Sequence, residues 1–130
     1  MSTALESVFG STAIVREEFP TKLVALAKVA NHKLDRYFQD LKNVINYNGT
    51  IRAQNVGTYY IVDHWHTRIL EFNRETNTID YLHHSYISQT TSTLIGRILR
   101  SLPREAVSFY LGQLSTRSPE DSKRLAKMIR

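Results

Sequence analysis

The sequence predicts an α+β fold: a long N-terminal helix, a four-stranded antiparallel β-meander, and two or three C-terminal helices. Apolar residues recur at helical spacing over residues 20–43, and helical spacing returns after residue 90. Between these regions lie short segments rich in β-branched and aromatic residues, separated by turn signals. We expect these strands to pair antiparallel, because parallel pairing needs long crossover connections between them.

Length and composition fit one globular domain over residues 1–130. No Pro-, Gly- or Ser-rich tract marks a linker. The absence of cysteine excludes disulfides, thiolate zinc sites and a cysteine nucleophile. The first residues do not resemble a signal peptide, and no stretch approaches the ~18 apolar residues of a membrane span. We therefore expect a cytoplasmic protein that has no membrane partner.

The N-terminal region is expected to contain an arm and then the long helix. Residues 1–15 show no clear period and predict a flexible arm or a short strand. The helix is expected over about 20–43, with Pro20 suited to its first turn and a turn cluster at Asn46, Asn48 and Gly49 ending it. Its apolar face comprises Leu23, Leu26, Ala27, Ala30, Leu34, Tyr37, Phe38 and Leu41.

Four strands are expected in the segments 50–55, 57–64, 67–73 and 77–83. Turn signals at 55–57 separate the first segment from the second, and those at 73–77 separate the third from the fourth. Ile69 faces opposite to Leu70 and Phe72, so the pattern leaves open which face of the sheet is buried. The apolar face is expected to pack on the long first helix.

The C-terminal region predicts amphipathic helices. Thr90 or Thr91 is suited to cap the first of them, which Pro103 ends. At about 100° per residue, the apolar side chains between Leu94 and Leu102 share one face, and Arg97 and Arg100 fall on the opposite side. A second apolar-faced segment follows from residue 104. Ser118, Pro119 and two acidic residues then mark the start of a final helix.

The net charge of +5 arises entirely after Gly96. Up to that residue nine basic and nine acidic residues balance, whereas eight basic residues meet three acidic ones in the remainder. Such a region attracts anions, for example nucleic acid, an acidic protein surface or a phosphate ligand, although the charge also serves solubility. The candidate binding residues of this basic face are Arg97, Arg100, Arg104, Arg117, Lys123, Arg124, Lys127 and Arg130.

Histidines form a second candidate site. Strands two and four of a meander run the same way, so the group His64, Trp65 and His66 and the pair His83 and His84 are expected at one end of the sheet, about 10 Å apart. With Asp63 or Asp80 they offer zinc ligands, but their spacing matches no metal motif, and exposed or core-capping histidines are the alternative. We interpret this loop as a binding surface in which Trp65 is an apolar anchor.

Catalytic signals are weak. No glycine-rich phosphate loop and no Gly-x-Ser-x-Gly elbow is present, and the neighbouring carboxylates Glu17 and Glu18 fit a helix start. We therefore predict no enzymatic activity, no catalytic residue, no metal and no cofactor. The histidines are the one feature that supports an enzyme.

Direct nucleic-acid binding is an alternative, with the basic face on phosphates and Tyr59, Tyr60, Trp65 and Tyr86 stacking on bases. No RNP-type motif or GXXG loop is present, and Pro103 stands where a helix–turn–helix commonly has glycine. Buried tyrosines and solvated arginines explain the same residues equally well.

The stretch from Asn48 to Pro103 resembles small accessory proteins of bacteriophages and prophages. The matching residues are Gly49, Thr50, Ile51, Ile61, His64, Thr67, Ile69, Thr90, Thr91, Arg97, Arg100, Leu102 and Pro103. The resemblance implies a small cytoplasmic product in a bacterial host that acts by stoichiometric binding, and it supplies no catalytic residues. The preceding helix and the basic tail depart from the shortest members of that group.

These observations predict a binding protein that inhibits or redirects a host protein or ribonucleoprotein complex, such as a CRISPR-type antiviral effector, through the basic face. The alternatives are direct binding of DNA or RNA and an oligomeric sponge for a small anionic ligand.

Overall fold

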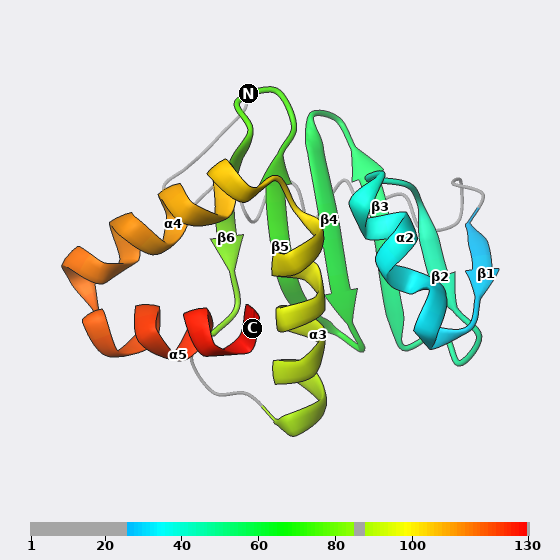
Figure 1. The fold of residues 1–130 in the computed structure, drawn as a ribbon. Helices are drawn as coiled ribbons and strands as arrows, with labels where there is room; N and C mark the ends of the chain where they lie inside the picture. Colours follow the sequence, from blue (N-terminus) through cyan, green and yellow to red (C-terminus); the bar gives the residue numbers. More distant parts are fainter. Residues whose placement is uncertain (1–25, 85–87, 130) are drawn as a thin grey trace.

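A computed structural model describes residues 26–84 and 88–129 of the chain. In these residues six strands form one sheet in sequential order, β1 to β6 (Figure 1). The strands are β1 (Ala27–Val29), β2 (Val44–Asn46), β3 (Ile51–Val56), β4 (Tyr59–His64), β5 (Thr67–Asn73) and β6 (Thr78–Leu82). The helices are η2 (Asn31–Lys33), α2 (Leu34–Gln39), α3 (Gln89–Ser101), α4 (Arg104–Arg117) and α5 (Pro119–Ile129).

The prediction of a long helix over 20–43 is wrong. Within the described residues, only Leu34–Gln39 of this segment is α-helical. Residues Ala27–Val29 instead form β1, which pairs in parallel with β2. The predicted apolar face holds for Leu34 and Phe38, which are buried from the helix. In β1 it fails, because Ala27 is exposed and Val29, which was not part of that face, is buried. The predicted arm 1–15 and residues 20–25 lie outside the described residues.

The prediction of a four-stranded meander is also wrong for the sheet as a whole. Strands β3 to β6 form at the expected segments and pair antiparallel. However, β2 extends this meander through a further antiparallel pair, and β1 adds a parallel one. The sheet is therefore mixed, and α2 supplies the connection that parallel pairing of β1 and β2 requires.

The α-helices of the described chain lie on one face of the sheet (Figure 1). The main core fills the space between these two layers, and it includes Phe38, Tyr60, Phe72, Ile95 and Leu125. An irregularity in the pairing of β4 with β5 lets both Ile69 and Leu70 join this core, although they are adjacent in sequence. The irregularity explains why alternation along β5 alone did not show which face of the sheet is buried against the helices.

The other face of the sheet carries a row of buried polar side chains. Arg68 lies between Asp63, whose Oδ1 is 2.6 Å from its Nε, and Glu71, whose Oε2 is 2.9 Å from its Nη1. Gln54 is fully buried on the same face, and its amide has no hydrogen-bond partner in the part of the chain that the structure describes. The paired charges stabilise one another, whereas an unpaired buried amide is costly.

Three helices follow the sheet in the described part of the chain. The cap of α3 is Ser88, whose hydroxyl accepts a hydrogen bond from Thr91 N at 3.2 Å. The prediction of Thr90 or Thr91 as cap is therefore wrong, because both lie in the first turn. None of the described helices has both the length and the apolar character needed to cross a membrane.

Candidate binding groove between the C-terminal helices

Arg97 was predicted to be a surface anchor, but the structure uses it to join two helices. Its Nε lies 2.7 Å from Oδ1 of Asp35 on α2, and its guanidinium also donates to the carbonyl of Asn31. The side chain is only 18% exposed. Arg97 therefore holds α3 against the segment that leads into α2, and little of its charge remains for a partner.

Arg100 is likewise bound within the molecule. Its Nη1 donates to the carbonyl oxygens of Met128 at 2.9 Å and Ile129 at 3.4 Å. These carbonyls belong to the last turn of α5, where a helix leaves acceptors unpaired and where a cation is favourable. One turn earlier on α3, Gly96 allows close approach, because a Cβ there would lie 2.5 Å from the carbonyl oxygen of Met128.

Arg124 secures the middle of α5. Its Nη2 donates to the carbonyl of His84 at 2.7 Å and to Oδ1 of Asp121 at 2.8 Å. Hydrogen bonds from Arg124 and then from Ser118 lower the pKa of Asp121. Arg124 thus ties α5 to the end of β6.

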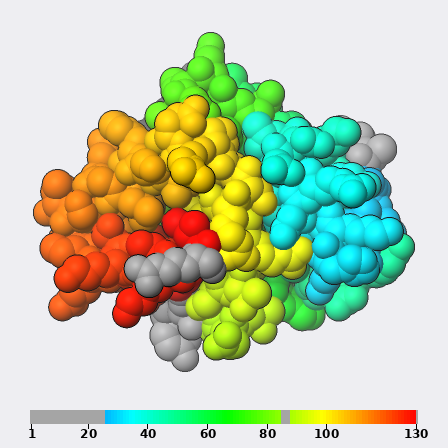
Figure 2. Space-filling model, viewed as in Figure 1, coloured from blue at the N-terminus to red at the C-terminus, as the bar shows by residue number. Residues whose placement is uncertain are grey.

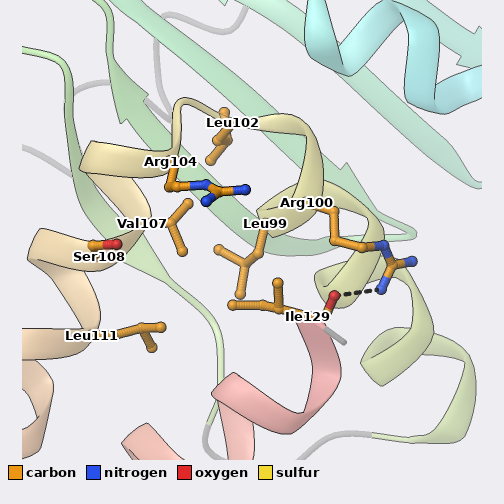
Figure 3. Close-up of a pocket in the computed structure, with 8 residues that line it drawn as sticks. All are labelled: Leu99, Arg100, Leu102, Arg104, Val107, Ser108, Leu111 and Ile129. Carbon is orange, nitrogen blue, oxygen red and sulfur yellow. Dashed lines mark hydrogen bonds between the residues drawn. The ribbon is translucent and has the colours of Figure 1, made fainter.

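Helices α3, α4 and α5 enclose a groove of about 440 Å³ (Figure 3). Its apolar residues come from all three helices and the turn between α3 and α4, and its polar groups are Arg100, Arg104 and Ser108. The lining is Leu99, Arg100, Leu102, Arg104, Val107, Ser108, Leu111 and Ile129. The groove therefore combines an apolar interior with a cationic rim.

The two arginines of the groove differ in their availability. In Figure 3, Arg100 turns toward the end of α5, where a dashed line marks its bond to Ile129, whereas Arg104 extends across the opening. Arg104 is exposed, and its guanidinium forms no hydrogen bond or ion pair with any residue that the structure describes. Arg104 is thus the groove's available cation, and a guanidinium can bind a carboxylate or a phosphate through two hydrogen bonds.

A second, smaller cavity adjoins the groove through Arg100. It has a volume of about 290 Å³ and is lined by Gln89, Ser92, Thr93, Arg100 and Met128. Four of its five lining residues are polar or charged, whereas five of the eight residues that line the main groove are apolar. Together the two cavities follow the surface of α3, which lies between α2 and the pair α4 and α5 in Figure 2.

The remaining residues of the predicted basic face do not line the groove. Arg117, Lys123 and Lys127 are exposed on α4 and α5, and Arg130 lies outside the described residues. Of the predicted set, the structure thus brings together Arg100 and Arg104 at the groove. Exposed charges outside it contribute to the field of this region rather than to a shaped site.

The histidine and tryptophan loop is divided between core and surface. His64 is buried, its Nδ1 lies 3.2 Å from Oγ1 of Thr91, and burial lowers its pKa. Trp65 and His66 form the exposed turn between β4 and β5, while His83 and His84 are half-buried. No group of three potential ligands within residues 26–84 and 88–129 is placed to hold a metal ion.

The tyrosines proposed for base stacking on the sheet are mostly engaged elsewhere. Tyr60 is fully buried, its hydroxyl donates to the carbonyl of Lys42 at 2.8 Å, and burial raises its pKa. Tyr59 donates to Oδ2 of Asp80 at 2.8 Å, and burial together with this bond raises its pKa to about 12. Tyr86 lies outside the described residues. Tyr60 is therefore unavailable for base stacking, whereas Tyr59 is half-buried with its hydroxyl bound to Asp80.

Sequence reasoning missed the groove because its residues are spread over three helices. Val107 and Leu111 are apolar residues one helical turn apart, which indicates a shared helix face. That Ile129 lies in the same groove depends on the packing of α5 against α3 and α4, which the sequence does not show. Gly96 stood out only as an isolated glycine within a helical pattern, which often has a packing reason.

Comparison with models of protein families, with curated proteins and with solved structures finds no match for this chain.

Proposed function

We propose that this chain is a non-enzymatic binding protein whose groove between α3, α4 and α5 receives an acidic, partly apolar segment of a partner protein. The observation that carries the proposal is the guanidinium of Arg104, which is exposed at the rim of an apolar groove and has no partner among residues 26–84 and 88–129. The surrounding C-terminal region holds the whole net charge of the chain. An acidic partner is therefore attracted at long range and then recognised at short range.

The lining favours a protein segment over a phosphate backbone. Leu99, Leu102, Val107, Leu111 and Ile129 offer apolar surface, which stabilises a complex only if the partner buries apolar groups against it. Aliphatic or aromatic side chains of a protein provide such groups beside a carboxylate. Interfaces of this kind depend on an anchor residue in a pocket, with charged groups near the rim.

The groove supports binding rather than catalysis. Ser108 is its one hydroxyl, and no histidine, aspartate or glutamate is among the eight lining residues that could activate it. A stoichiometric complex in which this chain covers an acidic surface of a host protein or ribonucleoprotein assembly is the activity that fits. Host machinery and antiviral defence complexes are the partner classes that the phage resemblance implies.

Matched charge reversals test the proposal. The tagged protein, Arg104→Glu and Arg117→Glu are each recovered from a bacterial lysate at low and at high salt, and bound species are weighed by native mass spectrometry. Both variants change the net charge equally, but only Arg104 lines the groove. We expect a discrete protein partner that persists at high salt and is lost with Arg104→Glu only.

Two other results would overturn this function. Equal loss with both variants would mean that general charge, not the groove, holds the partner. Recovery of nucleic acid without any protein partner, lost with Arg104→Glu and dissociating as salt rises, would assign the groove's arginine to phosphate contacts, because the affinity of such contacts falls steeply with salt.

A further inference from the structure

One end of the sheet carries two exposed aromatic side chains, Tyr47 and Trp65. Trp65 lies in the two-residue turn between β4 and β5 and is 64% exposed, and Tyr47 lies in the turn between β2 and β3 and is 67% exposed. Trp65 N donates to the carbonyl of Thr50 at 2.7 Å, which joins the two turns. This end is at the bottom of Figure 1, where β4 ends.

The backbone of Trp65 makes its exposure notable. Its φ of 57° lies in the left-handed region, which bulky side chains seldom adopt. A buried indole would offset this strain through packing, but most of the Trp65 side chain faces solvent. A two-residue hairpin turn requires a positive φ at its first position, where glycine, asparagine or aspartate is usual, so tryptophan is an unfavourable choice for the turn alone.

A hydrogen-bond network fixes the turn that carries Tyr47. Nδ2 of Asn46 donates to Oδ1 of Asn31 at 2.8 Å and to Oγ1 of Thr50 at 2.9 Å. Tyr47 N donates to the carbonyl of Val29 at 3.1 Å. The segment Asn31–Lys33 therefore lies at this same end, and the two turns form a fixed rather than an adaptable surface.

The groups around the two rings are polar or basic. His32, Lys33 and His66 are exposed. The carboxylates of the adjoining elements are already paired, since Asp35 binds Arg97 and Asp63 binds Arg68. An anion that approaches this end therefore meets a lysine and imidazole side chains. The carboxylates of Asp35 and Asp63 repel it less because each is paired with an arginine.

We propose that this aromatic end, formed by His32, Lys33, Tyr47, Trp65 and His66, binds single-stranded nucleic acid. The rings of Trp65 and Tyr47 stack on bases, and Lys33 contacts a phosphate. Stacking platforms beside basic groups are the usual means of binding single strands without sequence preference. A duplex hides its base faces and fits this end less well.

A protein partner fits this end less well than it fits the groove. Among the described residues the large exposed apolar side chains are Tyr47, Trp65 and Phe109, so no exposed large aliphatic residue adjoins the two rings. Protein hot spots lie in packed apolar surroundings, which this polar end lacks. The proposal is independent of the groove and its partner.

The test uses the fluorescence of Trp65, which is the chain's single tryptophan. Titration with oligothymidylate and oligouridylate is expected to quench its emission, and a DNA hairpin duplex of equal nucleotide content is expected to quench it far less. Affinity is then measured by the anisotropy of labelled oligothymidylate. Tyr47→Ala is expected to weaken binding about tenfold, as the loss of one stacked base does, and Phe109→Ala is a matched exposed-aromatic control that leaves it unchanged.

Trp65→Gly separates binding from folding. Glycine adopts a φ of 57° without strain, so this variant is expected to fold at least as well while binding about tenfold more weakly. Absence of quenching, or unchanged affinity of Tyr47→Ala and Trp65→Gly, would overturn the proposal. Loss of oligonucleotide binding on Arg104→Glu but not on Trp65→Gly would also overturn it, by moving the contact to the C-terminal helices.

Discussion

The guanidinium of Arg100 on α3 lies 2.9 Å from the carbonyl oxygen of Met128 in the last turn of α5. This bond and the close approach at Gly96 fix the end of α5 on α3. Ile129, the next residue, then forms one wall of the groove. The position of α5 thus determines the shape of the candidate binding site.

Gly96→Ala is expected to destabilise the fold. The added Cβ would lie 2.5 Å from the backbone oxygen of Met128, so α5 must shift, which outweighs the better helix propensity of alanine. We expect the free energy of unfolding to fall by about 1 kcal/mol or more in urea titrations. Gly112→Ala is the control on α4, where nothing lies near the new Cβ, and it is expected to stabilise by up to about 1 kcal/mol. Equal effects of the two substitutions would contradict the close contact.

Arg68→Met is expected to be far more destabilising. It leaves the buried carboxylates of Asp63 and Glu71 without the cation that contacts both. Removing one partner from a buried ion pair typically costs about 3–5 kcal/mol, which urea unfolding measures directly. Arg97→Met serves as a comparison, since its partner Asp35 is half-exposed and such pairs contribute about 1 kcal/mol or less. A similar loss for both would show that Arg68 is not isolated from solvent.

Gln54→Met is expected to stabilise the protein. Methionine has a similar volume, and it removes a fully buried amide that has no hydrogen-bond partner among the described residues. We expect a gain of about 1 kcal/mol in thermal or urea unfolding. Gln113→Met on the exposed side of α4 is a control that is expected to change little. A loss of stability in Gln54→Met would show that the amide is satisfied.

Stability is expected to fall as the pH drops below about 6.5, the ordinary pKa of histidine. Burial lowers the pKa of His64, so between the lowered and the ordinary value the unfolded chain binds more protons than the folded chain. The contribution of His64 is therefore complete above the ordinary pKa and is lost as the pH falls through the lowered one. Thermal unfolding between about pH 7.5 and 5.5 is expected to show a weaker pH dependence for His64→Asn. An unchanged slope in that variant would contradict the assignment.

The strands from Ile51 to Leu82 could be predicted from the sequence because each combines β-branched and aromatic residues with clear turn signals. The segment 26–43 could not, because Ala27–Val29 is too short for alternation to distinguish it from a helix turn, and its pairing with β2 is a tertiary contact. The same limit applies to the candidate site. The charge of Arg97 and Arg100 was visible, but their internal acceptors, Asp35 and the end of α5, lie far away in sequence.

Crosslinking from within the groove shows whether a partner protein binds there. Because the chain has no cysteine, Ser108→Cys and Ser115→Cys each create a single attachment point for a photo-crosslinker, the first in the groove and the second elsewhere on α4. We expect that in a bacterial lysate Ser108→Cys captures one protein in equimolar ratio through a peptide bearing acidic and apolar residues, and that Ser115→Cys does not. Equal capture from both positions, or capture of nucleic acid alone from Ser108→Cys, would contradict the groove as the binding site.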